Sequence, residues 1–182
     1  MIIFLFFFFI FILSITIIFL FSSPNFSPIP YFPSNKKDIP LIIKALNLKN
    51  NQVVFDLGAG DGIVIFESAK VAFEKKLNTK FFAIEINPIL ILIMWIRWLF
   101  HPNKKNIKII RGDIFNMNFK KLLTFNFLLL TFYVYISPWY LKKVVKNLKS
   151  KIKNFSLVSY FYAIPKIKIK KIFEGKNKIF VY

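Results

Sequence analysis

The chain opens with a long apolar run. Residues 2–21 are broken only by Ser14 and Thr16, and no charged side chain precedes Lys36. A helix of this length rises about 1.5 Å per residue, which matches the roughly 30 Å hydrocarbon core of a bilayer. Every Lys and Arg follows the run, so the positive-inside rule places the rest of the chain in the cytoplasm. We therefore expect residues 1–22 to be a single-pass transmembrane anchor, with a cleaved signal peptide ending near Ser22 as the alternative.

Proline is concentrated in the segment that follows. Five of the nine prolines lie between residues 22 and 40, a composition that favours an extended, semi-rigid chain. We expect residues 23–37 to form a linker. Its second half, residues 30–34, is also aromatic, so this part is either a strap packed on the following domain or a lid near a binding site.

The remainder, residues 38–182, alternates between two patterns. Apolar runs typical of buried strands occur at residues 53–57, 80–84, 106–111, 126–135 and 155–163. Helical patterns occur at residues 38–48, 63–72, 88–100 and 137–148. The last two alternating runs, residues 166–173 and 178–182, are joined by Glu-Gly-Lys-Asn and predict a hairpin. This order predicts a Rossmann-like α/β domain, a three-layer α/β/α sandwich with a mostly parallel sheet and a C-terminal antiparallel hairpin.

A glycine-rich turn follows the first strand. Asp56 precedes Leu-Gly-Ala-Gly-Asp-Gly, which contains three of the five glycines: Gly58, Gly60 and Gly62. Glycine allows the backbone to approach a ligand closely, and the helix N-terminus after the turn can bind polar or anionic groups. A strand, a glycine turn and a helix together form one half of a nucleotide-binding fold.

Acidic residues are scarce and lie near strand ends. The chain has eight Asp and Glu, and four of them follow predicted strands: Asp56, Asp61, Glu85 and Asp113. Ligands of open α/β sheets bind outside the carboxyl ends of the strands. We expect these carboxylates to converge on a ligand that carries hydroxyls, amino groups and a positive charge, because an acid-ringed site favours a cation. The Gly-x-Gly-x-Gly spacing disfavours a dinucleotide oxidoreductase.

These motifs resemble those of class I S-adenosylmethionine-dependent methyltransferases. The segment from Asp56 to Gly62 looks like the first motif of that family. Glu85 occupies a position like that of the family's ribose-binding acid, and Gly112-Asp113-Ile114 resembles the segment that contacts the adenine. The resemblance implies S-adenosylmethionine as the cofactor. It implies these cofactor-binding residues: Asp56, Gly58, Gly60, Asp61, Gly62, Glu85, Asn87, Asp113 and Ile114.

A closer resemblance covers residues 30–182. The strap Pro30-Tyr-Phe-Pro-Ser, the glycine motif and Glu85-Ile-Asn-Pro-Ile-Leu are similar to those of the membrane-anchored protein-lysine methyltransferases. These enzymes modify the ATP synthase c-subunit and the adenine nucleotide translocase, and bacterial relatives share their motifs. The resemblance implies a membrane partner and a membrane-protein lysine as the methyl acceptor. The family usually has Arg after Asp-Gly, where this chain has Ile63.

Methyl transfer to an amine depends mainly on alignment of the reacting atoms. The lysine amine must arrive deprotonated, since its reference pKa is about 10.4. The chain has no cysteine, and the single histidine, His101, lies just past a predicted helix as a helix-end residue would. Tyr133 and Tyr135 end the fourth strand and are candidate catalytic residues that orient the amine; strand packing is the alternative.

Charge and composition leave other functions open. The formal net charge is +19, yet the chain is rich in Ile, Phe, Lys and Asn throughout and its lysines are scattered, so we favour a generic solvated surface over a nucleic-acid site. Methylation of RNA or a small molecule is the second hypothesis, and a membrane-tethered binding module with a decayed site is the third.

The apolar helix 88–100 is too short to span a bilayer. It is either buried on the sheet or places Trp95, Trp98 and Phe100 at the membrane interface.

Overall fold

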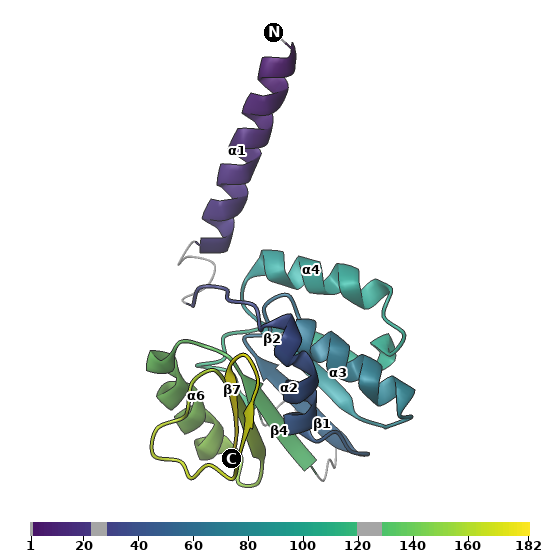
Figure 1. Ribbon diagram of the computed structural model, residues 1–182, viewed down its shortest axis with the longest axis vertical. Helices are drawn as coiled ribbons and strands as arrows, with labels where there is room; N and C mark the ends of the chain where they lie inside the picture. Colours follow the sequence, from purple (N-terminus) through teal and green to yellow (C-terminus); the bar gives the residue numbers. More distant parts are fainter. Residues whose placement is uncertain (1, 23–28, 120–128) are drawn as a thin grey trace.

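The computed structural model describes residues 2–22, 29–119 and 129–182, without the side chains of residues 17–22. In these residues a seven-stranded sheet with the order β3-β2-β1-β4-β5-β7-β6 forms the centre of the domain (Figure 1). The strands are β1 (Gln52–Leu57), β2 (Lys80–Glu85), β3 (Ile107–Arg111), β4 (Leu129–Val134), β5 (Ser156–Tyr160), β6 (Lys171–Glu174) and β7 (Lys178–Val181). Strands β1 to β5 are parallel, and β7 runs antiparallel to both β5 and β6.

Helices cover both faces of the sheet. They are α2 (Ile39–Leu46), α3 (Ile63–Glu74), α4 (Pro88–Leu99) and α6 (Pro138–Lys151), with short 3-10 turns at Lys36–Asp38 and Lys104–Asn106. Successive strand residues point to opposite faces, so Val54 of β1 packs with α2, α3 and α4, whereas Val53 and Phe55 pack with α6. This arrangement confirms the predicted three-layer sandwich with a mostly parallel sheet.

The strand order reverses between β1 and β4. From β1 the chain proceeds outward through β2 to β3, and it then returns to β4 on the other side of β1. Ligands of open α/β sheets bind in the crevice at such a reversal, outside the carboxyl ends of the strands. The glycine turn after β1 and the tyrosines at the end of β4 therefore border the same crevice.

The structure refines three local predictions. The helix predicted at residues 38–48 begins at Ile39, and the Asp38 side chain does not cap it. The hairpin adds two strands, and the antiparallel strand β7 lies inside the sheet while β6 forms the edge. Of the strand predicted at residues 126–135, β4 begins at Leu129, and residues 126–128 lie outside the described residues.

The N-terminal run forms a helix, α1 (Ile2–Ser22). Its large apolar side chains are exposed, from 41% at Ile10 to 81% at Ile2. Counting only the side chains that the structure describes, no helix is long and apolar enough to cross a membrane. The transmembrane anchor at residues 1–22 therefore stays a prediction.

The Asp38 carboxylate joins the start of α2 to the C-terminal hairpin. Asp38 is 1% exposed and accepts hydrogen bonds from the Tyr160 hydroxyl (2.7 Å) and the backbone amides of Lys176 (2.6 Å) and Asn177 (3.0 Å). Gly175 packs directly against this carboxylate and leaves no room for a Cβ. Burial acts to raise the pKa of Asp38, but these hydrogen bonds outweigh it and lower the pKa below its ordinary value.

We predict that Asp38→Asn lowers the free energy of unfolding at neutral pH by about 1.5–3 kcal/mol, because it replaces an acceptor oxygen by a donor. The folded-state pKa of Asp38 lies below its unfolded value of about 3.9, so this stabilisation is present above that pH and is lost as the pH falls through the folded pKa. Urea unfolding should therefore show a difference that shrinks in acid. Glu174→Gln in the same hairpin, at an exposed carboxylate, is the control. If Asp38→Asn lowers the free energy of unfolding equally at acid and neutral pH, the ionised Asp38 carboxylate is not the stabilising group.

Candidate functional site

The glycine turn after β1 places backbone atoms without side chains at the crevice beyond the strand ends. Gly58, Gly60 and Gly62 all have positive φ, at 81°, 59° and 79°. A Cβ on Gly60 would lie 2.6 Å from the Tyr31 ring, and one on Gly62 would lie 2.6 Å from the Phe66 ring. Only glycine therefore fits both the backbone conformation and the space. Gly62 precedes α3 and lies behind the crevice rather than on its surface.

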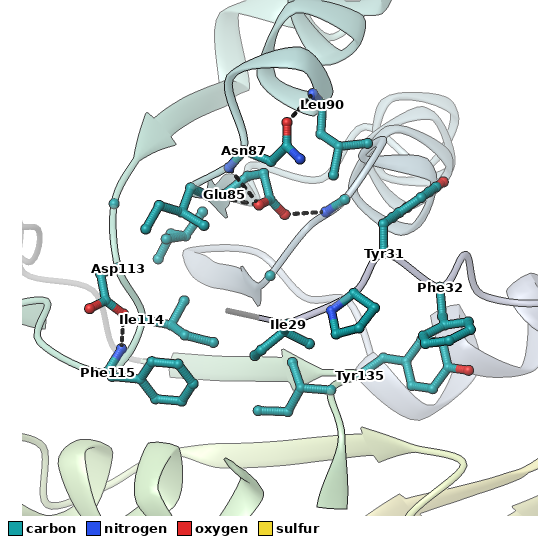
Figure 2. A pocket seen from close by; sticks show the side chains of 17 residues that line it. Ile29, Tyr31, Phe32, Glu85, Asn87, Leu90, Asp113, Ile114, Phe115 and Tyr135 are labelled. Atoms are coloured by element: carbon teal, nitrogen blue, oxygen red, sulfur yellow. Dashed lines mark hydrogen bonds between the residues drawn. The ribbon is translucent and has the colours of Figure 1, made fainter. Parts of the chain in front are cut away.

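The Glu85 carboxylate holds the turns after β1 and β2 together (Figure 2). It is 6% exposed, and its Oε2 accepts a hydrogen bond from the Gly60 amide at 2.8 Å. Its Oε1 accepts from the amides of Ile86 (2.8 Å) and Asn87 (2.9 Å). A carboxylate offers about four acceptor positions, so one position on Oε2 is left for a ligand. Glu85 can therefore bind one ribose hydroxyl in this arrangement rather than two.

Other predicted binding residues also have local partners. Asn87 accepts hydrogen bonds from the amides of Ile89 (2.9 Å) and Leu90 (3.4 Å) and so caps α4. Asp113 accepts from the Phe115 amide at 2.8 Å and from the Asn116 side chain at 2.6 Å. Both residues border the crevice together with Ile114. Their side chains shape the crevice, and each remains a proposed cofactor contact.

The proline-rich strap, taken here as residues 29–34, covers this crevice. Ile29, Tyr31 and Phe32 line one side of a cavity of about 50 Å³, opposite Asp113 and its neighbours (Figure 2). Ligand pockets typically measure about 300–1,000 Å³. A nucleoside-sized cofactor therefore needs the strap to move outward. The structure thus places the strap at the site, where it both packs on the domain and covers the crevice.

A second cavity lies deeper, between the strap and the ends of β1 and β4. Asp56 is 2% exposed and pairs in register with Tyr133 of β4. Burial raises the pKa of Asp56 well above its ordinary value, and the negative charges of Glu85 and Asp61 raise it further. The environment thus penalises the charged form of Asp56. A cationic ligand beside it would remove that penalty.

The two predicted catalytic tyrosines line this deeper cavity. Tyr133 is buried, and its hydroxyl forms a 2.9 Å hydrogen bond with Ser34 Oγ. Burial, followed by the charge of Asp56, raises the pKa of Tyr133, which keeps its hydroxyl neutral. Tyr135 lines both cavities, and its ring meets the ring of Tyr160 edge-on at 4.8 Å.

Asp61 closes the mouth of the deeper cavity. It accepts hydrogen bonds from the Arg97 guanidinium at 2.8 Å and from the Ile63 amide at 3.2 Å, and it also bonds the Tyr31 side chain. Arg97 was not predicted as a site residue, whereas Tyr31 and Ser34 lie in the segment 30–34 that was predicted as a strap or a lid near the site. Arg97 had one signal, because it is the single charged residue in an otherwise apolar helical stretch.

His101 has the helix-end role predicted for it. Its Nδ1 accepts a hydrogen bond from the Asn103 amide at 3.1 Å, so its Nε2 carries the proton and donates to the Phe66 carbonyl at 3.0 Å. It lines neither cavity.

Comparison with solved structures identifies the fold. An RNA methyltransferase of Salinibacter ruber, solved with S-adenosylhomocysteine, matches 83% of this chain and 92% of its own at 16% identity and a TM-score of 0.69. Precorrin-6y C5,15-methyltransferase of Geobacter metallireducens matches 88% of this chain and 92% of its own, at 14% identity and a TM-score of 0.58.

A third similar structure is an S-adenosylmethionine-dependent methyltransferase of Geobacter sulfurreducens, also solved with S-adenosylhomocysteine. It matches 72% of this chain and 52% of its own, at 13% identity and a TM-score of 0.52. No family model and no curated protein matches the sequence. The chain therefore has the Rossmann-like α/β fold of these methyltransferase structures.

We predict that Glu85→Gln weakens S-adenosylmethionine binding by about 1.5–3 kcal/mol, the range for a hydrogen bond to a charged group. The substitution should also lower the free energy of unfolding by about 1–3 kcal/mol, because it leaves a buried amide without an acceptor. Calorimetric titration and urea unfolding measure the two effects. Glu74→Gln, at the exposed end of α3, should change neither. Unchanged cofactor affinity in folded Glu85→Gln protein would rule out the ribose contact.

A second prediction concerns Asp56 and pH. Burial raises the pKa of Asp56, and a bound cation would lower it again by favouring the ionised form. Cofactor affinity should therefore rise with pH until the free protein has lost the Asp56 proton, and calorimetry in buffers of different ionisation enthalpy should detect proton release. Asp56→Asn should bind more weakly and lose this pH dependence. An identical pH dependence in the variant would contradict the assignment.

Proposed function

We propose that this chain transfers a methyl group from S-adenosylmethionine to a lysine of a membrane protein. The observation that carries the proposal is the buried Asp56 carboxylate of raised pKa, which lies between the glycine turn and two tyrosines. Such a site favours a positively charged ligand, and S-adenosylmethionine carries its methyl group on a sulfonium cation, which activates it for transfer.

The residues of the crevice fit this cofactor. The glycine turn and Asp56 suit its amino-acid end, since backbone amides and a carboxylate complement its carboxylate and amino groups. Glu85 has one free acceptor position for a ribose hydroxyl. Asp113 and Ile114 border the same crevice on the far side and suit the adenine.

A groove beside the site suits a polypeptide acceptor. It measures about 1010 Å³ and runs between α2, α3 and the end of α4. Ile63 lines both this groove and the deeper cavity, and Arg97 lines the groove while it bonds Asp61 at the cavity mouth. Its lining combines apolar side chains with Lys36, Lys44, Lys75 and Arg97, against the single acid Glu67. An acidic, amphipathic segment would complement this groove.

The tyrosines then act on the acceptor amine. Among the described residues that line the deeper cavity, none is His, Cys or Lys. Asp56 and Asp61 also line it, but Asp56 is assigned to the amino group of the cofactor and Asp61 is paired with Arg97. In this proposal the amine loses its proton before it enters, and the neutral hydroxyls of Tyr133 and Tyr135 accept its remaining hydrogens and orient its lone pair. Ser34 fixes the Tyr133 hydroxyl for this role.

Membrane attachment belongs to the same proposal. Residues 1–22 form the anchor, residues 23–37 the linker, and residues 38–182 the cytoplasmic methyltransferase domain. The support is the apolar sequence of α1 and the absence of charge before Lys36. A tether of this length raises the effective concentration of membrane proteins at the site.

RNA methylation is a second candidate. It is favoured by the net charge of +19 and by the similarity to the RNA methyltransferase of Salinibacter ruber. The apolar part of the groove disfavours it, because contacts to an RNA backbone are predominantly charged and polar.

Labelled cofactor decides between these functions. Membranes that contain the chain should incorporate label into a protein band that resists ribonuclease, with the label recovered as methyl-lysine after hydrolysis. Tyr133→Phe should bind the cofactor normally and reduce labelling about tenfold, the effect of one lost hydrogen bond of about 1.4 kcal/mol. Ribonuclease-sensitive label would establish RNA as the substrate. No label and no cofactor binding would indicate a decayed binding module.

A further inference from the structure

Helix α4 carries an exposed apolar stripe on its outer face. Leu92, Trp95, Ile96 and Leu99 are spaced i, i+3, i+4 and i+7, so they share one face of the helix. They are exposed by 60%, 44%, 52% and 54%, and Phe100 at the helix end by 84%. We call these five residues the outer stripe. A contiguous exposed apolar surface of this kind marks an interaction site.

The opposite face of α4 is already packed. Leu90 and Met94 are buried, and Trp98 packs against the core. The Trp98 indole donates to the Lys104 carbonyl at 3.0 Å and to the Ile107 carbonyl at 3.2 Å. Trp98 therefore packs on the domain, as the buried alternative for this helix predicted, and its ring also meets that of Trp95 at 5.2 Å between centroids. Leu92, Trp95, Ile96 and Leu99 are therefore open to another contact, whereas Phe100 also lines the groove proposed for the acceptor.

The chain around α4 is basic in sequence. No Asp or Glu occurs in residues 86–112. The cations of this segment are Arg97, which pairs with Asp61, and Lys104, Lys105, Lys108 and Arg111. An apolar helix face with a Trp and flanking Lys and Arg has the composition of a helix that lies in the headgroup region of a bilayer. Each cation near an anionic leaflet contributes to that attraction.

The chain also leads from α1 to this side of the domain. The strap enters the fold at Ile29 and lines the crevice together with Asn87 and Leu90 at the start of α4 (Figures 1 and 2). From Ser22 to Ile29 the backbone spans at most about 25 Å, at 3.3–3.6 Å per residue. The linker therefore allows at most about 25 Å between the end of α1 and the point where the strap meets the crevice.

We propose that the outer stripe of α4 rests on the headgroup layer of an anionic phospholipid bilayer. This inference rests on the membrane attachment in the proposed function and adds a second contact that orients the domain. Because the start of α4 forms part of the crevice wall, docking of α4 fixes the site at the membrane surface. Acceptor lysines within reach of the headgroups are then favoured over lysines of distant domains.

Bromine-labelled lipids test the contact with the full-length chain. The protein is bound to vesicles of phosphatidylcholine and phosphatidylserine with brominated acyl chains, which quench nearby tryptophan fluorescence. Of the three tryptophans, Trp95 lies in the outer stripe, and Trp139, 82% exposed on α6, lies on the other face of the sheet. We expect the quenched signal to fall in Trp95→Phe, with a smaller remainder from Trp98, whose ring centroid lies 5.2 Å from that of Trp95, and to persist unchanged in Trp139→Phe.

A negative charge introduced inside the outer stripe can be compared with the same charge introduced outside it. Ile96→Glu should shift the equilibrium away from the docked state about tenfold, because it replaces a buried aliphatic group by an anion beside anionic lipid. Quenching of Trp95 should fall accordingly. Phe73→Glu, at a 49% exposed position of α3, is the control and should leave quenching unchanged.

The outcomes separate this inference from the membrane attachment itself. Cosedimentation of the full chain with vesicles and quenching of Trp95 support both. Cosedimentation without quenching of Trp95 overturns the α4 contact and leaves the anchor intact. Absence of cosedimentation overturns both.

A second copy of the chain is the competing occupant. The chain has no cysteine, so Ile96→Cys introduces a single thiol into the outer stripe. Efficient disulfide formation between two such copies on vesicles, without quenching of Trp95, would show that another protein molecule covers the stripe and would overturn the proposal.

Discussion

The Glu85 carboxylate is the interaction on which the arrangement of the site depends. It binds the amides of Gly60, Ile86 and Asn87, which belong to the turns after β1 and β2. The first of these turns carries the glycines, and the second begins α4. A single buried anion therefore sets the crevice, the start of the helix with the outer stripe, and the last acceptor position for a ribose hydroxyl.

The strap links access to the site with attachment of the chain. Its downstream end is held by two buried contacts, Ser34 with Tyr133 and Asp38 with the C-terminal hairpin. Its upstream part, residues 29–32, covers a cavity that is too small for a nucleoside. Displacement of residues 29–32 alone would enlarge this cavity without breaking the hydrogen bond between Ser34 and Tyr133.

The sequence predicted the elements whose signals are local. The run from Val53 to Gly62 combines a buried strand, glycines with positive φ and a helix start, and each of these has its own pattern. It did not predict the partners of Asp38, which lie up to 139 residues away, or the bond from Arg97 to Asp61. Such contacts depend on the packing of whole elements, and side-chain periodicity carries no information about them. For the same reason Glu85 was predicted as a ligand contact and not as an acceptor for three backbone amides.

The scarcity of acids explains how so basic a chain can select a cationic ligand. A net charge of +19 creates a field that repels cations, but charges on the surface are screened beyond about 10 Å at 0.1 M salt. Buried charges are screened much less, so Asp56 and Glu85, which are 2% and 6% exposed, dominate the potential inside the crevice. The lysines instead act outside it, on an anionic surface or an acidic segment of a substrate. Selectivity for the cofactor and attraction to the partner are thus carried by opposite charges in separate places.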